Sequence, residues 1–183
     1  AELEQLEEMV SIQARLALDG RKFERLTVDV DTTVCPVFGS QEGAEVGPNP
    51  RYRGRRSYHP ILARIAEVDT VLGVRLRPGN TGLGECDTED IEQWLDRLEE
   101  TVGRDPIITV RIDAGGDCAA LLNAITARGA HVLVKAKQTG NLLHAAMFHA
   151  DWEVTDTDAN GSPTRRVGVG SRSYCQHMVI SLG

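Results

Sequence analysis

Two short apolar segments, each with an aspartate at the end of its predicted strand, constrain the fold of this chain most. They read VDVDTTV at 28–34 and IITVRID at 107–113, about eighty positions later. The alternation of Val28 and Val30 with polar residues is typical of a strand with one buried face. Where two such strands are neighbours in one sheet, Asp31 and Asp113 meet at its edge, and oxygen-only sites suit hard divalent cations. The pattern favours metal-assisted chemistry, although an aspartate at a strand end is also common for structural reasons alone.

The composition favours a protein with one sizeable core and no membrane span. The chain has 183 residues, of which 41% are hydrophobic, enough for one domain or for one domain and an incomplete second. No apolar run approaches the roughly 20 residues of a membrane helix, and the chain starts AELEQLEE, where a signal peptide is basic and then apolar. We therefore expect a soluble, cytoplasmic protein. The four cysteines have no C-x-x-C spacing, which favours free thiols over a zinc site.

The charge of the chain is unevenly distributed. The net charge of −7 argues against non-specific attraction of the whole chain to nucleic acid. Residues 46–66, however, contain no acid and five arginines. Four of these arginines lie together in the sequence: Arg51, Arg53, Arg55 and Arg56. We expect these four side chains to contact DNA phosphates, and the alternative interpretation is a solvated loop.

The hydrophobic periodicity predicts a mixed α/β protein. Strands are predicted over 26–31, 61–67, 71–77, 107–112 and 131–136, and helices over 2–18, 87–100 and 119–127. Residues 34–38 are interpreted as a strand returning beside the first, and residues 39–58 as a long loop. This β-β-β-α-β-α-β order predicts a mixed sheet with flanking helices. From Trp152 onward the pattern becomes β-like, interrupted by the turn Asn160-Gly161.

That strand order, with one aspartate on the first strand and another ending the fourth, resembles the ribonuclease H-like fold of DDE-type transposases. Five stretches in the same order strengthen the resemblance: VDVDTTV, VFGSQEGAE, RRSYHPILARIAE, RLRPGNT and RIDAGGD. They are similar to stretches of bacterial insertion-sequence transposases, which move DNA by cut and paste. The resemblance covers residues 26–137 and implies a ribonuclease H-like catalytic core of the α/β class.

The resemblance also implies a metal site made of carboxylates. In this family three carboxylates hold two Mg²⁺ (or Mn²⁺) ions, which activate a water or a 3′-hydroxyl and stabilise the leaving oxygen. Asp31 matches the first acid, because in the family that acid directly precedes a Thr or Ser pair, and Asp113 matches the second. Asp29 lies on the same predicted sheet face as Asp31 and is the main competitor for the first role.

No residue matches the third acid securely. The family places a Glu on a late helix in the pattern Y-x-x-R-x-x-x-E; Tyr52 and Arg55 match its start, but His59 stands where the Glu belongs. The only glutamate after Asp113 is Glu153, which lies in a β-patterned segment. We therefore expect the chain to stop inside a β-rich insertion, before the helix that carries the Glu.

The expected organisation follows from these matches. A helix leading from an upstream region is expected at 1–20, the ribonuclease H-like core at 21–150, and the start of an incomplete insertion at 151–183. The expected function is cleavage and transfer of double-stranded DNA in transposition, at element ends and target, with little or no activity in these 183 residues. For the intact protein, a homodimer is one possible assembly. Two alternatives remain: a nuclease that completes its site with Asp117 or Glu153 and only hydrolyses DNA, and a DNA-binding remnant without metal chemistry.

Overall fold

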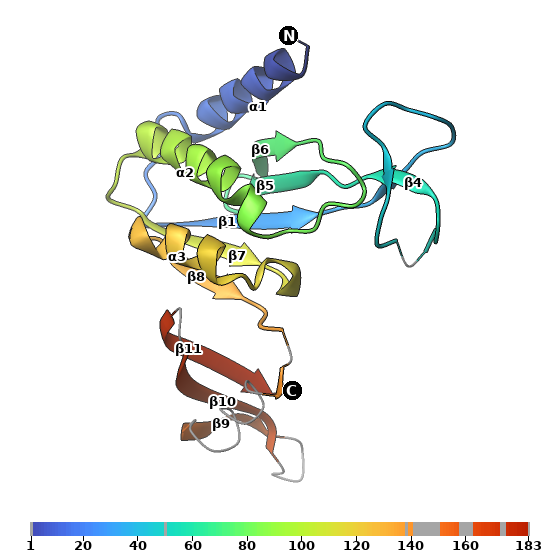
Figure 1. Ribbon diagram of the computed structural model, residues 1–183. Coiled ribbons are helices and arrows are strands. Elements are labelled where there is room, and N and C mark those ends of the chain that lie inside the picture. Colours follow the sequence, from blue (N-terminus) through green and yellow to red (C-terminus); the bar gives the residue numbers. More distant parts are fainter. Residues whose placement is uncertain are drawn as a thin grey trace. The chain divides into compact units, whose positions relative to one another are not determined.

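A mixed sheet of five strands forms the centre of residues 1–135 (Figure 1). Its strands lie side by side in the order β6-β5-β1-β7-β8. The strand bounds are β1 Arg25–Thr32, β5 Ile61–Ile65, β6 Thr70–Arg75, β7 Ile107–Ile112 and β8 His131–Val134. The computed structural model describes residues 2–49, 51–137, 139–140, 151–157, 163–172 and 175–182. The chain divides into two compact units, residues 1–135 and 136–183.

β1 is the central strand of this sheet. Its apolar residues Leu26, Val28 and Val30 are buried, because they alternate with polar residues and so share one face. β1 pairs antiparallel with β5 and parallel with β7, and β7 pairs parallel with β8. Parallel neighbours need a crossover, which the helices α2 (Thr88–Val102) and α3 (Ala119–Ala127) provide. The predicted fold class, a mixed sheet with flanking helices, is confirmed.

The hydrophobic core lies between the sheet and its helices. α2 and α3 contact each other and lie together beside the sheet in Figure 1. Their buried residues are Ile91, Trp94, Leu95, Leu98, Leu121, Leu122 and Ile125. Gly73 on β6 leaves room for the Trp94 indole, since a Cβ at this position would overlap the ring. The third helix, α1 (Glu2–Leu18), has the bounds that the sequence predicted, and it packs against β6 and α2 with Ala14 and Leu18 buried.

A second, small sheet stands where the sequence predicted a returning strand and a long loop. Its order is β2-β4-β3, with β2 at Cys35–Pro36, β3 at Glu45–Val46 and β4 at Arg56–Tyr58. We refer to residues 34–58 as the arginine lobe, which extends beyond the carboxyl end of β1 in Figure 1. The predicted long loop over 39–58 is therefore wrong in part, because two short strands interrupt it.

The predicted return of residues 34–38 beside β1 is also wrong. β2 pairs with β4, whereas the antiparallel partner of β1 is β5. β5 buries Ile61, Ala63 and Ile65 on one face, so its pairing extends the apolar surface that β1 offers to the core. Residues 35–36 present no such apolar face, and Pro36 has no N–H to donate to a ladder. Burial of apolar area decides the pairing here.

The unit at 136–183 contains a three-stranded antiparallel sheet in the order β11-β10-β9. Its strands are β9 Asp151–Thr157, β10 Pro163–Arg172 and β11 Cys175–Leu182. The predicted β-like pattern from Trp152 onward is confirmed. The predicted turn at Asn160-Gly161 lies outside the described residues, and the predicted boundaries of three domains stay a prediction.

Across the part of the chain that the structure describes, no helix has the length and apolar character needed to span a bilayer.

Candidate metal centre and nucleic-acid surface

The register of β1 and β7 brings the two predicted acids to the same end of neighbouring strands. Val30 is the Cα partner of Ile112 in the parallel ladder, and Asp31 and Asp113 each follow that pair directly. Asp113 has extended backbone, φ −73° and ψ −179°. Because extended residues alternate between faces, both acids are on the face opposite to the buried Val30 and Ile112. Asp31 and Asp113 thus both follow the last paired residues of β1 and β7, at the same end of two adjacent strands.

Both carboxylates are exposed and are held by backbone amides. The Oδ1 atom of Asp31 accepts a hydrogen bond from the Thr32 amide at 2.7 Å. The Oδ1 atom of Asp113 accepts one from the Gly115 amide at 2.8 Å, where Asp113 caps the short 3₁₀ helix η2 (Ala114–Gly116). Within the described residues, neither carboxylate forms an ion pair. Each therefore keeps oxygen atoms that are directed to solvent and open to a cation.

Asp29, the competing residue, is in a different situation. Arg111 is its Cα partner on β7 and donates two hydrogen bonds to its carboxylate, at 2.5 and 2.7 Å. Arg64 on β5 adds a contact at 3.7 Å. The hydrogen bond from Arg111 is the main cause that lowers the pKa of Asp29 below its usual range, against desolvation, with smaller contributions from the charges of Arg111 and Arg64. Both carboxylate oxygens of Asp29 are thus occupied by guanidinium groups.

A third acid does not join this pair within the described residues. No group of three or more His, Cys, Asp or Glu side chains in that part of the chain is arranged to hold a metal. Glu153 lies on β9, opposite Val167 of β10, in the other compact unit. Tyr52, Arg55 and His59 belong to the arginine lobe and its exit, so the partial Y-x-x-R match is not on a helix.

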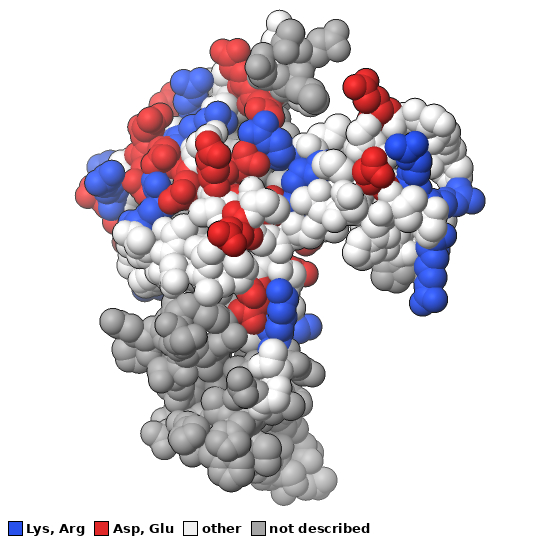
Figure 2. Space-filling model, in the orientation of Figure 1, with Lys and Arg blue, Asp and Glu red and all other residues white. Residues whose placement is uncertain are grey.

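The arginine lobe carries all four of the predicted DNA-contacting side chains in exposed positions. Figure 2 shows positive side chains gathered on this lobe, whereas the helical side of the molecule mixes both signs. Arg51, Arg53, Arg55 and Arg56 are all exposed. Arg56 is partly engaged within the lobe: its Nε donates to the Ala44 carbonyl at 2.7 Å, and an Nη atom lies 3.8 Å from Glu45. The other three have no ion pair among the described residues.

The arginine lobe also contains aromatic contacts that the sequence did not reveal. The guanidinium carbon of Arg55 lies 4.6 Å from the ring centroid of Phe38 and 5.8 Å from that of Tyr52. Arg51 lies 5.6 Å from the Tyr52 ring. The R-Y-R order of residues 51–53 gave a local signal for one contact. No signal in the sequence could pair Phe38 with an arginine 17 positions later.

Tight backbone contacts attach the arginine lobe to the loop that follows β6. A Cβ added to Gly47 would overlap the Gly79 carbonyl, and one added to Gly79 would overlap Ser57 and the Glu45 carbonyl. The same loop is stabilised by Arg77, which is buried, pairs with the buried Asp87, and donates to the His59 carbonyl at 3.0 Å. Asp87 stands at the N-cap position of α2, but its carboxylate binds Arg77 and the Gly84 amide rather than an amide of that helix.

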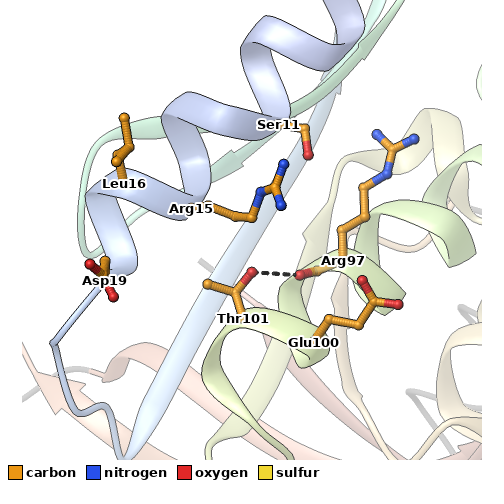
Figure 3. A pocket seen from close by; sticks show the side chains of 7 residues that line it. All are labelled: Ser11, Arg15, Leu16, Asp19, Arg97, Glu100 and Thr101. Atoms are coloured by element: carbon orange, nitrogen blue, oxygen red, sulfur yellow. Dashed lines mark hydrogen bonds between the residues drawn. The ribbon is translucent and has the colours of Figure 1, made fainter.

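A pocket of about 570 Å³ lies away from the acids, between α1 and α2 (Figure 3). Ser11, Arg15 and Leu16 of α1 line it together with Asp19, which follows α1, and with Arg97, Glu100 and Thr101 of α2. The Thr101 hydroxyl donates to the Arg97 carbonyl at 2.9 Å, which is an ordinary bond within a helix. Its lining of mixed charge has no constellation of catalytic side chains, so the acid pair remains the candidate site.

The fold and the acid pair together define an α/β protein with a mixed sheet and two aspartates at the same end of adjacent strands. Residues 1–177 match the family described as Transposase DDE domain group 1. The chain belongs to this family. The predicted resemblance to DDE-type transposases is therefore confirmed, and the five-stranded mixed sheet lies within the matched residues.

Solved structures of transposases are similar to the chain at low sequence identity. The piggyBac transposase synaptic complex with hairpin DNA is 6% identical, with a TM-score of 0.48, over 85% of this chain and 32% of that one. The Mos1 mariner paired-end complex with Mn is 10% identical, with a TM-score of 0.45, over 78% of this chain and 47% of that one. The catalytic domain of the Mos1 mariner transposase is 14% identical, with a TM-score of 0.43, over 80% of this chain and 71% of that one. The chain thus spans about a third and about half of the first two. No curated protein sequence matches it.

Membership of this family implies the use of a divalent metal. The residues present fit such an ion at Asp31 and Asp113, because both are exposed carboxylates whose only hydrogen bonds among the described residues come from backbone amides. Hard cations such as Mg²⁺ and Mn²⁺ prefer oxygen ligands of this kind. Asp29 fits less well, since a cation there would have to displace Arg111.

Proposed function

We propose that this chain is the catalytic core of a transposase that cleaves DNA strands and joins them to a target. The observation that carries the proposal is the position of Asp31 and Asp113, one residue beyond the Val30–Ile112 pair of two parallel strands. Family membership supports the reaction class. Double-stranded DNA is the proposed substrate, at the ends of the element and at the target.

The acid pair is proposed to bind a divalent cation, Mg²⁺ or Mn²⁺, with Asp31 and Asp113 as ligands. When bound, the ion would activate the attacking water or 3′-hydroxyl and stabilise the leaving oxygen. The backbone amides of Thr32 and Gly115 orient the two carboxylates. The Arg111–Asp29 pair, next to them on the same face, keeps a guanidinium beside the site and leaves Asp31 as the first ligand.

The arginine lobe is proposed to hold the DNA backbone near the acids. The lobe starts directly after β1, so the chain that carries Asp31 continues into the basic surface. Arg51, Arg53 and Arg55 supply exposed charges for phosphate contacts, and Arg56 supplies a weaker one because it is partly engaged with Ala44 and Glu45. This arrangement positions a phosphodiester by electrostatic contact with the backbone rather than by base sequence.

The activity of the 183-residue chain alone is proposed to be weak. The proposed site has two carboxylates, whereas the family uses three, and a site with less negative charge holds two cations poorly. A homodimer and the choice between Mg²⁺ and Mn²⁺ stay predictions.

A nicking assay on supercoiled DNA with Mg²⁺ or Mn²⁺ tests the proposal. We expect slow, metal-dependent nicking that Asp31→Asn and Asp113→Asn each abolish, because each change removes a ligand charge with little change in shape. Asp29→Asn is the matched control and should keep metal-dependent activity. Loss of nicking with Asp29→Asn but not with Asp31→Asn would contradict the assignment. Loss of nicking with Glu153→Gln would instead support the alternative function, a nuclease that completes its site with Glu153 and only hydrolyses DNA.

A further inference from the structure

The arginine lobe has an exposed aromatic surface that phosphate binding does not explain. Phe38 is 74% exposed, and Tyr52 is 36% exposed. Contacts to phosphates need only arginine side chains. An aromatic ring exposed to water is unfavourable, and it does not contribute to phosphate binding. A ligand with a flat, apolar face would account for both rings and for the arginine that contacts them.

The two rings are held in place by the local backbone and by arginine. The Tyr52 amide donates to the Asn49 side chain at 2.9 Å, and the Arg55 amide donates to the Tyr52 carbonyl at 3.2 Å. Gly54 permits this turn with a φ of +76°. The Arg55 guanidinium then lies within cation–π distance of both rings, 4.6 Å from the centroid of Phe38 and 5.8 Å from that of Tyr52.

We propose that Phe38, Tyr52 and Arg55 form a stacking site for an unpaired nucleobase. The proposal rests on the proposed function, since it assumes that the lobe binds DNA. Exposed aromatic rings beside arginines bind single-stranded nucleic acid by stacking on the base face, which every base offers. Inside a duplex that face is covered by neighbouring base pairs. An extrahelical or frayed base therefore fits the site, and the adjacent phosphates fit Arg51 and Arg53.

The charge of the lobe favours a nucleic acid over a second copy of this chain as the occupant. Two copies of the lobe would bring Arg51, Arg53 and Arg55 of each into proximity, and like charges repel. Stable protein interfaces bury roughly 800 Å² per partner, whereas the exposed large apolar side chains of the lobe are Phe38, Val46 and Tyr52 among the described residues. A nucleotide instead supplies both a flat ring and a negative charge.

The test compares two DNA duplexes of equal length and equal ends, one fully paired and one with a single extrahelical 2-aminopurine at its centre. We expect the wild-type chain to bind the second more tightly. Phe38→Ala should reduce affinity for the bulged duplex by roughly 5- to 100-fold, as expected when one base loses its stacking partner, and leave affinity for the paired duplex within about twofold. Quenching of 2-aminopurine fluorescence should be lost in the same variant.

Two further variants separate stacking from other roles of Phe38. Phe38→Leu keeps an apolar side chain without a ring and should behave like the alanine variant, whereas Phe38→Trp should retain the preference. Arg53→Ala, the control for phosphate contact, should reduce the affinity for both duplexes by the same factor. Since Phe38 is mostly exposed, these changes should not unfold the chain.

Three outcomes overturn the inference in distinguishable ways. If Phe38→Ala reduced the affinity for both duplexes equally, Phe38 would be assigned to general DNA contact. A shift from dimer to monomer in sedimentation with that variant would assign it to self-association. Absence of binding to either duplex by the wild-type chain would overturn the DNA-binding function as well. Loss of metal-dependent nicking with the bulge preference intact would count against the catalytic proposal alone.

Discussion

Arg111 on β7 donates two hydrogen bonds to Asp29, its partner in the parallel ladder of β1. This contact distinguishes two aspartates that are only two residues apart on one strand face. Asp29 is neutralised by a guanidinium, whereas the Asp31 carboxylate has a single hydrogen bond, from the neighbouring Thr32 amide, among the described contacts. This difference supports the proposal that Asp31, together with Asp113, binds the cation.

Metal binding should separate the two aspartates directly. We expect Asp31→Asn and Asp113→Asn each to weaken Mn²⁺ affinity by roughly tenfold or more, because a hard cation loses a charged oxygen ligand. Asp29→Asn should stay close to wild type. Titration of free Mn²⁺ by electron paramagnetic resonance measures all three affinities. A stronger loss for Asp29→Asn than for Asp31→Asn would show that the cation displaces Arg111.

The Asp29–Arg111 pair should make stability depend on acid pH. The hydrogen bond from Arg111 lowers the pKa of Asp29 in the folded state. The ionised form is therefore favoured by folding, and this contribution is present above the unfolded pKa of about 4. It is lost as pH falls through the lower folded pKa. In urea unfolding followed from pH 7 downward, Asp29→Asn should show a shallower loss of stability below about pH 4 than wild type. Arg111→Met should show the same flattening, and an unchanged slope in both variants would contradict the assignment.

DNA affinity should depend on salt through the arginine lobe. Each phosphate contact adds about 0.9 to the slope of log affinity against log salt concentration. Replacing all four arginines, Arg51, Arg53, Arg55 and Arg56, with alanine should flatten the slope by up to about 3.6. Arg56→Ala alone should contribute least, because its guanidinium is partly engaged by Ala44 and Glu45. Fluorescence anisotropy over a salt series measures the slopes, and an unchanged slope in the fourfold variant would assign the lobe to solvation.

The glycine contact between the arginine lobe and the loop after β6 should be sensitive to a single methyl group. Gly79→Ala places a Cβ on the Ser57 side chain and the Glu45 carbonyl, and Gly47→Ala places one on the Gly79 carbonyl. Overpacking of this kind typically costs about 1–3 kcal/mol. Gly82→Ala, on the same loop with open space around it, is the matched control. Chemical denaturation compares the three variants, and equal stabilities would show that the lobe moves freely relative to the loop.

The buried Arg77–Asp87 pair should be costly to break from either side. Arg77→Met or Asp87→Leu leaves one buried charge without its partner, a change that costs about 3–5 kcal/mol in typical proteins. The double variant should recover part of this loss, because no charge remains buried. Arg104→Ala removes an exposed pair with Glu99 and should change the free energy of unfolding by less than about 1 kcal/mol. A double variant less stable than either single variant would argue that Arg77 acts mainly through the His59 carbonyl.

The amino-acid sequence by itself determined the elements of the main sheet and their order along the chain. The alternation in 26–31, the stripe of Ile91, Trp94, Leu95 and Leu98, and the apolar run 107–112 are local patterns, and local patterns decide which face of an element is buried. The same patterns place Asp31 and Asp113 at strand ends. The family resemblance then depended on five stretches in their sequence order, which the family match over 1–177 confirms.

Tertiary structure alone decided the contact partners of the functional side chains and of the central strand. Asp29 differs from Asp31 only because Arg111 lies opposite it, and that position depends on the register of two strands far apart in sequence. The pairing of β1 with β5 rather than with 34–38, the capture of Asp87 by Arg77, and the contact of Phe38 with Arg55 have the same origin. Each results from packing summed over many distant residues, so no local window of the sequence contains it.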